Sequence, residues 1–354
     1  MKKNVLFLGL ILMSQLFTNC SDNASDPVEP TTDLYKEVLT NVSVDVITKT
    51  YFDLYTNATL LKTACQNLSI GDETELQVVK NAWTATRAPW EKSEGFLYGP
   101  VDTEGIDPAI DAWPVDVTAI DAIIASGNSI TSASLENNNA RGFHTLEYFI
   151  WGLNGNKTAA SLTNRELEYL VAAAINLQEK TLQLYNGWLQ TNGNFAKNFI
   201  NAGETGSIYT SKKGALEEFV EGLIIIADEV ANGKIEEPLN GNNGNAKPEA
   251  EESRFSNNSK LDFANNMRSI QNIYLGDYTT DGKGLSDIVL VKNPTLDTQI
   301  KTKITEAIQA IEAIPGTFTT AIVSNRNAVI NAQTKVSELQ NILESQLKPL
   351  ILNL

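Results

Sequence analysis

The stretch "TNRELEYLVAAAINLQEKTLQLYNGWLQ", residues 163–190, decides the fold class of this chain. Thr163 and Glu166 form a capping box, the pattern that starts many helices. Small and apolar side chains then recur every three or four residues, as they do on the buried face of a helix. These positions are Leu167, Leu170, Ala174, Leu177 and Thr181. The pattern predicts a long amphipathic helix.

Helical spacing continues through most of the chain, and strand patterns are scarce. Near the C-terminus an apolar seam of the bundle type runs through Val329, Ala332, Val336, Leu339 and Leu343. Two Asn- and Gly-rich segments interrupt the helical pattern, near residue 205 and at residues 239–253. We therefore expect an all-α protein of two helical bundle-like domains, residues 33–205 and 206–354.

The composition is that of a globular protein with an acidic balance. Of its 354 residues, 42% are hydrophobic and 20% charged. Lys and Arg number 27 against 43 Asp and Glu, a formal net charge of −16. This charge argues against nucleic acid as a partner, because phosphate binding requires clustered cations. It is compatible with attraction of metal cations and equally with plain solubility.

The N-terminus predicts export. Residues 1–19 combine two lysines with the apolar run "VLFLGLILM", as in a secretory signal peptide. The following "LFTNC" resembles the bacterial lipoprotein pattern, in which Cys20 is acylated after cleavage, and residues 20–32 would form a polar tether. We expect an outer-membrane lipoprotein on the periplasmic or cell-surface face. The alternative is an ordinary cleaved signal with a chance cysteine. Cys65, which alone remains if Cys20 is acylated, is expected to be a small buried helix residue.

The only histidine of the chain lies in "RGFHTLEYFIWG", residues 141–152. On a helix, His144 and Glu147 share one face and can point at one spot, as in metal sites of helical bundles. The same spacing suits a buried histidine that is simply hydrogen-bonded to the glutamate. Gly142 lies on the other side of the helix, where we expect close backbone packing.

One histidine limits the kinds of site that a single chain can build. Zinc sites of the two-histidine or three-histidine type are excluded within one molecule. No Gly-x-Ser-x-Gly nucleophile elbow accompanies His144. A metal bound here would have one imidazole and several oxygen ligands, a mixture that suits iron, manganese or calcium better than structural zinc.

Two further segments carry polar groups in unusual settings. Residues 82–102, "AWTATRAPWEKSEGFLYGPVD", place charged groups among aromatic residues, and Pro89 should kink or end that helix. The charged groups are Arg87, Glu91, Glu94 and Asp102. An interhelix corner with surface salt bridges explains them equally well.

Within residues 251–276, one helix face is apolar and the other carries small polar groups. The polar stripe consists of Asp262, Asn265, Asn266 and Ser269. Asn and Ser form helices poorly and have no advantage on a solvated face. We expect this stripe to line a polar interface.

Together the three segments resemble the imelysin family, also called insulin-cleaving membrane protease-like proteins. The family signature Gly-x-His-x-x-Glu is matched by Gly142, His144 and Glu147. The flanking motifs "PWE.SE.F.YGP.D" and "ESRFS…DFANN…IQNIY.G" agree with family segments in the same order. The resemblance covers essentially the whole mature chain.

The resemblance implies two helical domains with the motif near the groove between them. It implies a centre at His144 and Glu147 with walls formed by other polar side chains. These are Arg87, Glu94, Asp102, Ser253, Ser256 and Asn266. We expect His144, Glu147 and Glu94 to be the metal ligands, with Arg87 orienting a carboxylate or neutralising an anionic co-ligand.

The family was first classed as peptidases, and many members are linked to iron uptake. We therefore expect an exported lipoprotein that binds either a metal ion, with iron as the expected metal, or an iron-bearing ligand for uptake. We also expect it to act with a partner protein of an uptake system. A metallopeptidase using Glu147 or Glu94 as a general base stays open. So does a non-catalytic structural lipoprotein with a buried His144. No residue pattern demands catalysis, and we favour a binding protein over an enzyme.

Overall fold

The computed structural model describes residues 32–136 and 139–354, and these form helices, turns and loops without a β-strand. The all-α prediction is confirmed. The expected signal peptide, most of the tether and Cys20 lie in residues 1–31, outside the described part of the chain. No helix in the described part is long and apolar enough to cross a membrane.

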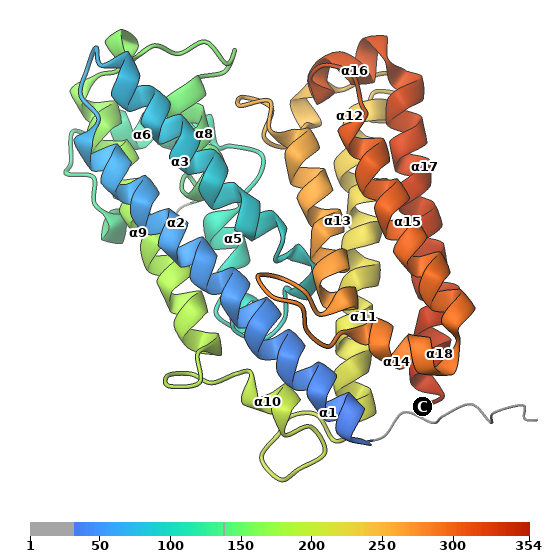
Figure 1. Ribbon diagram of the computed structural model, residues 1–354. Coiled ribbons are helices and arrows are strands. Elements are labelled where there is room, and N and C mark those ends of the chain that lie inside the picture. The colour runs from blue at the N-terminus through green and yellow to red at the C-terminus, as the bar shows by residue number, and fades with distance from the viewer. Residues whose placement is uncertain (1–31, 137–138) are drawn as a thin grey trace, which may run out of the picture.

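The helices gather in two groups that lie side by side (Figure 1). In the first group, α2, α3 and α9 pack together and α8 lies against α3 and α9. Its helices are α1 (Thr32–Asn41), α2 (Lys49–Asn67), α3 (Glu73–Glu91), α4 (Pro100–Thr103), α5 (Asp107–Ile110), α6 (Val117–Ala125), α7 (Ser132–Leu135), α8 (Gly142–Trp151), α9 (Asn164–Trp188) and α10 (Lys197–Ile200).

The second group is built on four long helices, α11, α13, α15 and α17, that pack against one another. Its members are α11 (Lys212–Asp228), α12 (Glu236–Asn240), α13 (Ser259–Leu275), α14 (Leu285–Lys292), α15 (Pro294–Glu312), α16 (Phe318–Ser324), α17 (Arg326–Ile342) and α18 (Lys348–Leu352). The division of the chain at residue 205 stays a prediction.

Wider π-helical turns join several helices into continuous rods. They are Val42–Thr48 between α1 and α2, Glu229–Ile235 between α11 and α12, and Leu343–Leu347 between α17 and α18. Short 3₁₀ turns occur at Glu94–Phe96, Ala159–Ser161 and Pro248–Ala250. Inserted π turns are often found at functional sites, and the turn Glu229–Ile235 contributes directly to the site described below.

Local sequence patterns explain where the helices begin. The Thr163 side chain accepts a hydrogen bond from the Glu166 amide, and the Glu166 carboxylate accepts one from the Thr163 amide at 2.8 Å, which confirms the capping box of α9. Asn293 caps α15 by accepting from the Leu296 amide, with Pro294 in the first turn. Pro89 does not end α3, which continues to Glu91.

The apolar faces predicted from spacing are buried. The seam of α17 and its continuation is buried at every position: Val329, Ala332, Val336, Leu339 and Leu343. On α13 the apolar face is buried too, and so is the polar stripe opposite it. The polar stripe faces the first helix group, because α13 packs against α3 and against Glu94–Phe96. The predicted polar interface is therefore confirmed, and Cys65 is buried on α2 as expected.

Gly142 starts α8 with its backbone in the left-handed region, at φ +81°. A Cβ atom at this position would lie 2.3 Å from the carbonyl oxygen of Ile110. This contact confirms the expected close packing and fixes the chain before Asp111 against the start of the helix that carries His144.

Replacing Gly142 by alanine should lower the free energy of unfolding by about 2–5 kcal/mol, because left-handed strain adds to overpacking against a main-chain atom. Urea unfolding followed by circular dichroism measures the loss. Gly127→Ala is the matched control, since Gly127 also has a positive φ of +67° but has open space around its Cβ position. Its cost should be about 1–2 kcal/mol, and equal losses in the two variants would contradict the packing argument.

Candidate metal centre

His144 is fully buried on α8, and its two ring nitrogens face carboxylates on opposite sides. Nδ1 lies 3.0 Å from Oε2 of Glu147, one helical turn further along α8. Nε2 lies 3.1 Å from Oδ1 of Asp111 and 3.5 Å from Oε1 of Glu252. The Trp113 ring packs edge-on against the imidazole, with 4.9 Å between ring centroids.

Glu147 is held firmly in place by the second helix group. Its Oε1 accepts hydrogen bonds from the Ser256 amide at 2.8 Å and from the Ser256 hydroxyl at 2.7 Å. Its other oxygen faces the Nδ1 atom of His144. Glu147 therefore orients the imidazole and has little freedom to do anything else.

Arg87, fully buried on α3, bridges the carboxylates on the Nε2 side. Its guanidinium pairs with Asp111, with Oε1 of Glu252 at 2.6 Å and with Oε1 of Glu91 at 2.5 Å. Planar guanidinium groups suit such multiple carboxylate contacts. Trp90 fixes the other oxygen of Asp111 by donating from Nε1 at 2.5 Å.

Lys234, from the π turn Glu229–Ile235, is the second buried cation of the cluster. Its Nζ lies 2.9 Å from Oε2 of Glu94 and 2.9 Å from Oε2 of Glu252. Asn266 on α13 donates to the carboxylates of Glu91 at 2.7 Å and of Glu94 at 3.0 Å. These contacts join the two helix groups through buried polar side chains.

The surroundings divide the carboxyl groups into two classes. Burial opposes the charge of Asp111, but Arg87 and His144 outweigh it and lower the pKa of Asp111 to about 2. Burial likewise disfavours charged Glu252, yet Lys234, His144 and Arg87 hold its pKa well below the usual value. Both carboxylates next to Nε2 are thus negatively charged at neutral pH.

The neighbouring carboxyl groups shift in the opposite direction. Burial raises the pKa of Glu91 to about 8 and that of Asp262 to about 6. Burial and the nearby Glu91 raise the pKa of Glu94 well above its ordinary value. Among the carboxyl groups that contact Arg87 or Lys234, Asp111 and Glu252 are therefore the ones whose pKa values are lowered.

The imidazole requires positive charge on its Nε2 side. A neutral histidine has one N–H, which it can donate to Glu147 or to the opposite side, but not to both. If Nδ1 donates to Glu147, the Nε2 lone pair faces two charged carboxylate oxygens. Nε2 makes no hydrogen bond of acceptable geometry among the described residues. Burial and Arg87 both lower the pKa of His144, but its three carboxylate partners raise it well above the ordinary value. Either a proton on Nε2 or a metal cation beside it would compensate the negative charge of Asp111 and Glu252.

Asp111, His144 and Glu252 meet the requirements of a metal-binding group. One ligand atom of each lies within 4.8 Å of the others. A histidine that donates its second N–H to a carboxylate while binding metal is a common arrangement, and Glu147 supplies that carboxylate. One nitrogen and two oxygens suit iron or manganese. The guanidinium of Arg87 contacts the same two carboxylates, so it would share them with the ion.

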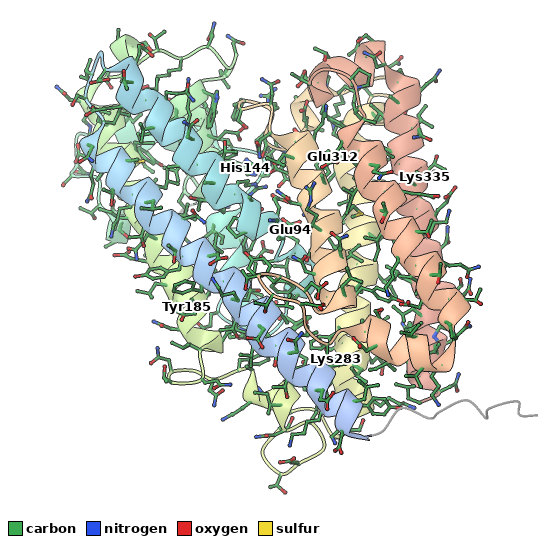
Figure 2. All side chains as sticks on the ribbon, viewed as in Figure 1. Glu94, His144, Tyr185, Lys283, Glu312 and Lys335 are labelled. Carbon is green, nitrogen blue, oxygen red and sulfur yellow. The ribbon has the colours of Figure 1, made fainter. Side chains whose placement is uncertain are left out.

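A polar cavity of about 390 Å³ opens beside this group. Asp111 and Glu252 form part of its wall, and Trp113 lines it as well. Figure 2 shows His144 and Glu94 where the two helix groups meet. The site is therefore connected to a cavity, although the imidazole itself is buried.

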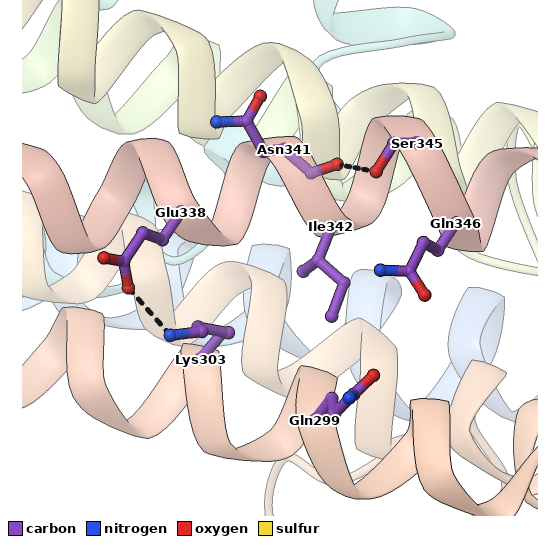
Figure 3. A pocket seen from close by; sticks show the side chains of 7 residues that line it. All are labelled: Gln299, Lys303, Glu338, Asn341, Ile342, Ser345 and Gln346. Carbon is purple, nitrogen blue, oxygen red and sulfur yellow. Dashed lines mark hydrogen bonds and ion pairs between the residues drawn. The ribbon is translucent and has the colours of Figure 1, made fainter.

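A second hollow lies on the outer face of the second group, between α15 and α17 (Figure 3). Its charged residues, Lys303 and Glu338, pair with each other at 2.7 Å, and the remaining lining is made of amides, a serine and Ile342. It offers no group with the chemistry of the His144 cluster.

The comparisons agree with this architecture. The family model of imelysin, peptidase M75, matches residues 47–350. The chain belongs to the imelysin family. This imelysin is 27% identical over 364 residues to Iron-regulated protein A of Synechococcus elongatus, an alignment that covers 99% of this chain and 94% of that protein.

Two crystal structures share its fold. A protein of Parabacteroides distasonis described as an iron-regulated protein A precursor has a TM-score of 0.82 and 30% identity, over 91% of this chain and 96% of that one. An imelysin-like protein of Psychrobacter arcticum has a TM-score of 0.75 and 18% identity, over 92% and 98% of the two chains. The second comparison shows the fold alone.

The structure brings most residues of the predicted imelysin site together, but in different roles. His144 and Arg87 lie at the centre, and Ser256 holds Glu147. Glu94 pairs with Lys234 and belongs, with Glu91 and Asp111, to a second group of possible metal ligands; the group that contains His144 consists of Asp111, His144 and Glu252. Of the other predicted wall residues, Ser253 and Asn266 are buried, whereas Asp102 on α4 is exposed. Asp102 takes no part in the ion pairs of the cluster.

The prediction missed three central residues. Asp111 begins "DAWPVD", where an acid two residues before a Trp-Pro pair was a usable signal. Glu252 lies in the segment that was interpreted as a break between helices, next to Ser253. Lys234 lies in "ANGK", and nothing in the local pattern distinguishes it from a solvated lysine.

Arg87→Met should lower the free energy of unfolding by about 3–5 kcal/mol, because it leaves buried carboxylates without their cation. The change is measured by urea unfolding in the presence of a metal chelator. Lys36→Met is the control. Lys36 pairs with Glu204 at the surface, with side chains 45% and 58% exposed, and its loss should cost about 0–1 kcal/mol. Similar losses in both variants would contradict a central role for Arg87.

Proposed function

We propose that this protein binds iron through Asp111, His144 and Glu252 and serves iron uptake as an exported lipoprotein. The observation that carries the proposal is the buried imidazole of His144. Its Nε2 faces two carboxylates whose surroundings keep them charged, at 3.1 and 3.5 Å, while Nδ1 faces a fixed carboxylate. A metal cation neutralises both carboxylates and accepts the Nε2 lone pair.

The relatives support iron as the ion. A family member from Synechococcus elongatus is named for its regulation by iron, and the alignment extends over nearly all of both chains. The Parabacteroides distasonis protein, at 30% identity, carries the same name. Regulation by iron is what a protein of iron uptake requires, and the nitrogen–oxygen ligand group is compatible with that ion.

The fixed position of Glu147 favours binding over peptide hydrolysis. A general base must have a free oxygen within reach of a water molecule. Both oxygens of Glu147 are already engaged, one by Ser256 and the other by His144. Its role in this proposal is to orient the imidazole.

Calorimetric titration with ferrous ion under anaerobic conditions tests the metal site. The wild-type protein should bind one ion, and His144→Ala should remove saturable binding because the nitrogen ligand is lost. Glu147→Gln should weaken binding by about 10–100-fold, as expected for a group that orients a ligand.

Glu251→Gln is the matched control for these variants. Glu251 is also a buried glutamate of the same loop, but it accepts hydrogen bonds from Ser259 and Thr319 and lies outside the metal-binding group. The Glu251→Gln variant should bind ferrous ion with the affinity of the wild type. Identical heats for the wild type and His144→Ala would refute the site.

Export and anchoring rest on the N-terminal sequence. Cys20→Ser should move the protein from the membrane fraction to the soluble fraction of a bacterium that processes lipoproteins, because several acyl chains attached at Cys20 would supply the anchor and all of them would be lost. Immunoblots of the two fractions measure this, with Cys65→Ser as the control. Wild-type protein found only in the soluble fraction would contradict anchoring.

A further inference from the structure

The cavity beside the metal centre changes from exposed to buried along its depth. Glu229, Gly233 and Glu237 are exposed and form its rim. Asp111 and Glu252 form the buried part of its wall, with side chains 6% and 11% exposed. A ligand that enters from solvent therefore passes the rim glutamates before it reaches the carboxylates that face His144.

The lining of this cavity is strongly acidic. Six of its residues are carboxylic acids: Glu94, Asp107, Asp111, Glu229, Glu237 and Glu252. Of the residues that line it, Lys234 alone is cationic. Its ammonium is already paired with two carboxylates at 2.9 Å and is only 8% exposed, so it has no free charge to offer an anion.

The apolar lining is equally limited. Leu97, Trp113 and Ala250 are the apolar side chains among the residues that line the cavity. A porphyrin requires extended apolar walls on both faces, and an iron chelate of citrate or of a similar acid requires free cations. The cavity supplies neither. Its volume of about 390 Å³ exceeds the roughly 180 Å³ of six waters around an ion, at about 30 Å³ each.

We propose that the metal reaches the centre as an uncomplexed hydrated cation, and that the glutamate-rimmed cavity is its entrance. This proposal rests on the proposed iron site and decides between a free ion and an iron-bearing ligand. Two observations carry it. The cavity lining includes six acidic side chains and one lysine that is already paired, and the buried Nε2 atom of His144 faces two of these acids, Asp111 and Glu252, without a hydrogen bond to any described residue. A concave surface with an excess of acidic side chains concentrates cations and accelerates their association.

The first test compares three forms of iron on the same wild-type protein: ferrous sulfate without oxygen, ferric citrate, and haemin. Ferrous ion should bind with saturation, and the two complexes should not. Binding of ferric citrate or haemin that is lost in His144→Ala, without binding of free ferrous ion, would overturn the entrance proposal and leave the iron site standing. Binding of none of the three would overturn the proposed function itself.

The second test measures association rates by stopped-flow tryptophan fluorescence with ferrous ion. The double variant Glu229→Gln, Glu237→Gln should associate about 3–10-fold more slowly at low ionic strength, and added salt should reduce the difference. The double variant Asp228→Asn, Glu249→Gln is the charge-matched control. Both control residues are exposed acids near the rim that do not line the cavity. Equal rates for the two double variants would overturn the entrance.

Discussion

A single buried guanidinium joins the two halves of the site. Arg87 reaches from α3 to Asp111 in the first helix group and to Glu252 in the second. Burying several carboxylates is unfavourable unless cations accompany them. Contact with Arg87 alone does not keep a carboxylate charged, because Glu91 contacts it as well and has a raised pKa. The two carboxylates that Arg87 shares with His144 are the ones whose pKa values are lowered. The candidate metal centre and the interface between the halves depend on the same ion pairs.

The parts of the molecule that could be predicted from the sequence are those determined by local interactions. The capping box at Thr163 and the stripe on α13 involve residues three or four apart, so the pattern contains the whole interaction. The polar stripe even indicated the buried interface correctly, because Asn and Ser have no reason to occupy a solvated helix face.

The ligand group could not be completed from the sequence, since its members come from a helix and two irregular segments. Asp111 follows the short helix α5, and Glu252 follows a 3₁₀ turn in a segment whose composition predicted only an interruption. Lys234 comes from a π turn, whose wider path is not encoded in a simple apolar period. Such positions are set by tertiary packing. The spacing of His144 and Glu147 correctly placed the two side chains next to each other, but it could not distinguish a metal ligand from a residue that orients one.

The contact between Gly142 and Ile110 has a consequence for the spacing of Asp111 and His144. The main chain of residue 110 touches the place where a side chain at residue 142 would lie. Asp111 is the residue after Ile110, and His144 is the second residue after Gly142. The main-chain positions of these two residues are therefore set by one backbone packed against another, which is less flexible than a contact between two side chains. In the proposed iron site, this rigid spacing would restrict the ionic radii that fit, so the smallest residue of the signature motif would affect ion selectivity without contacting the ion.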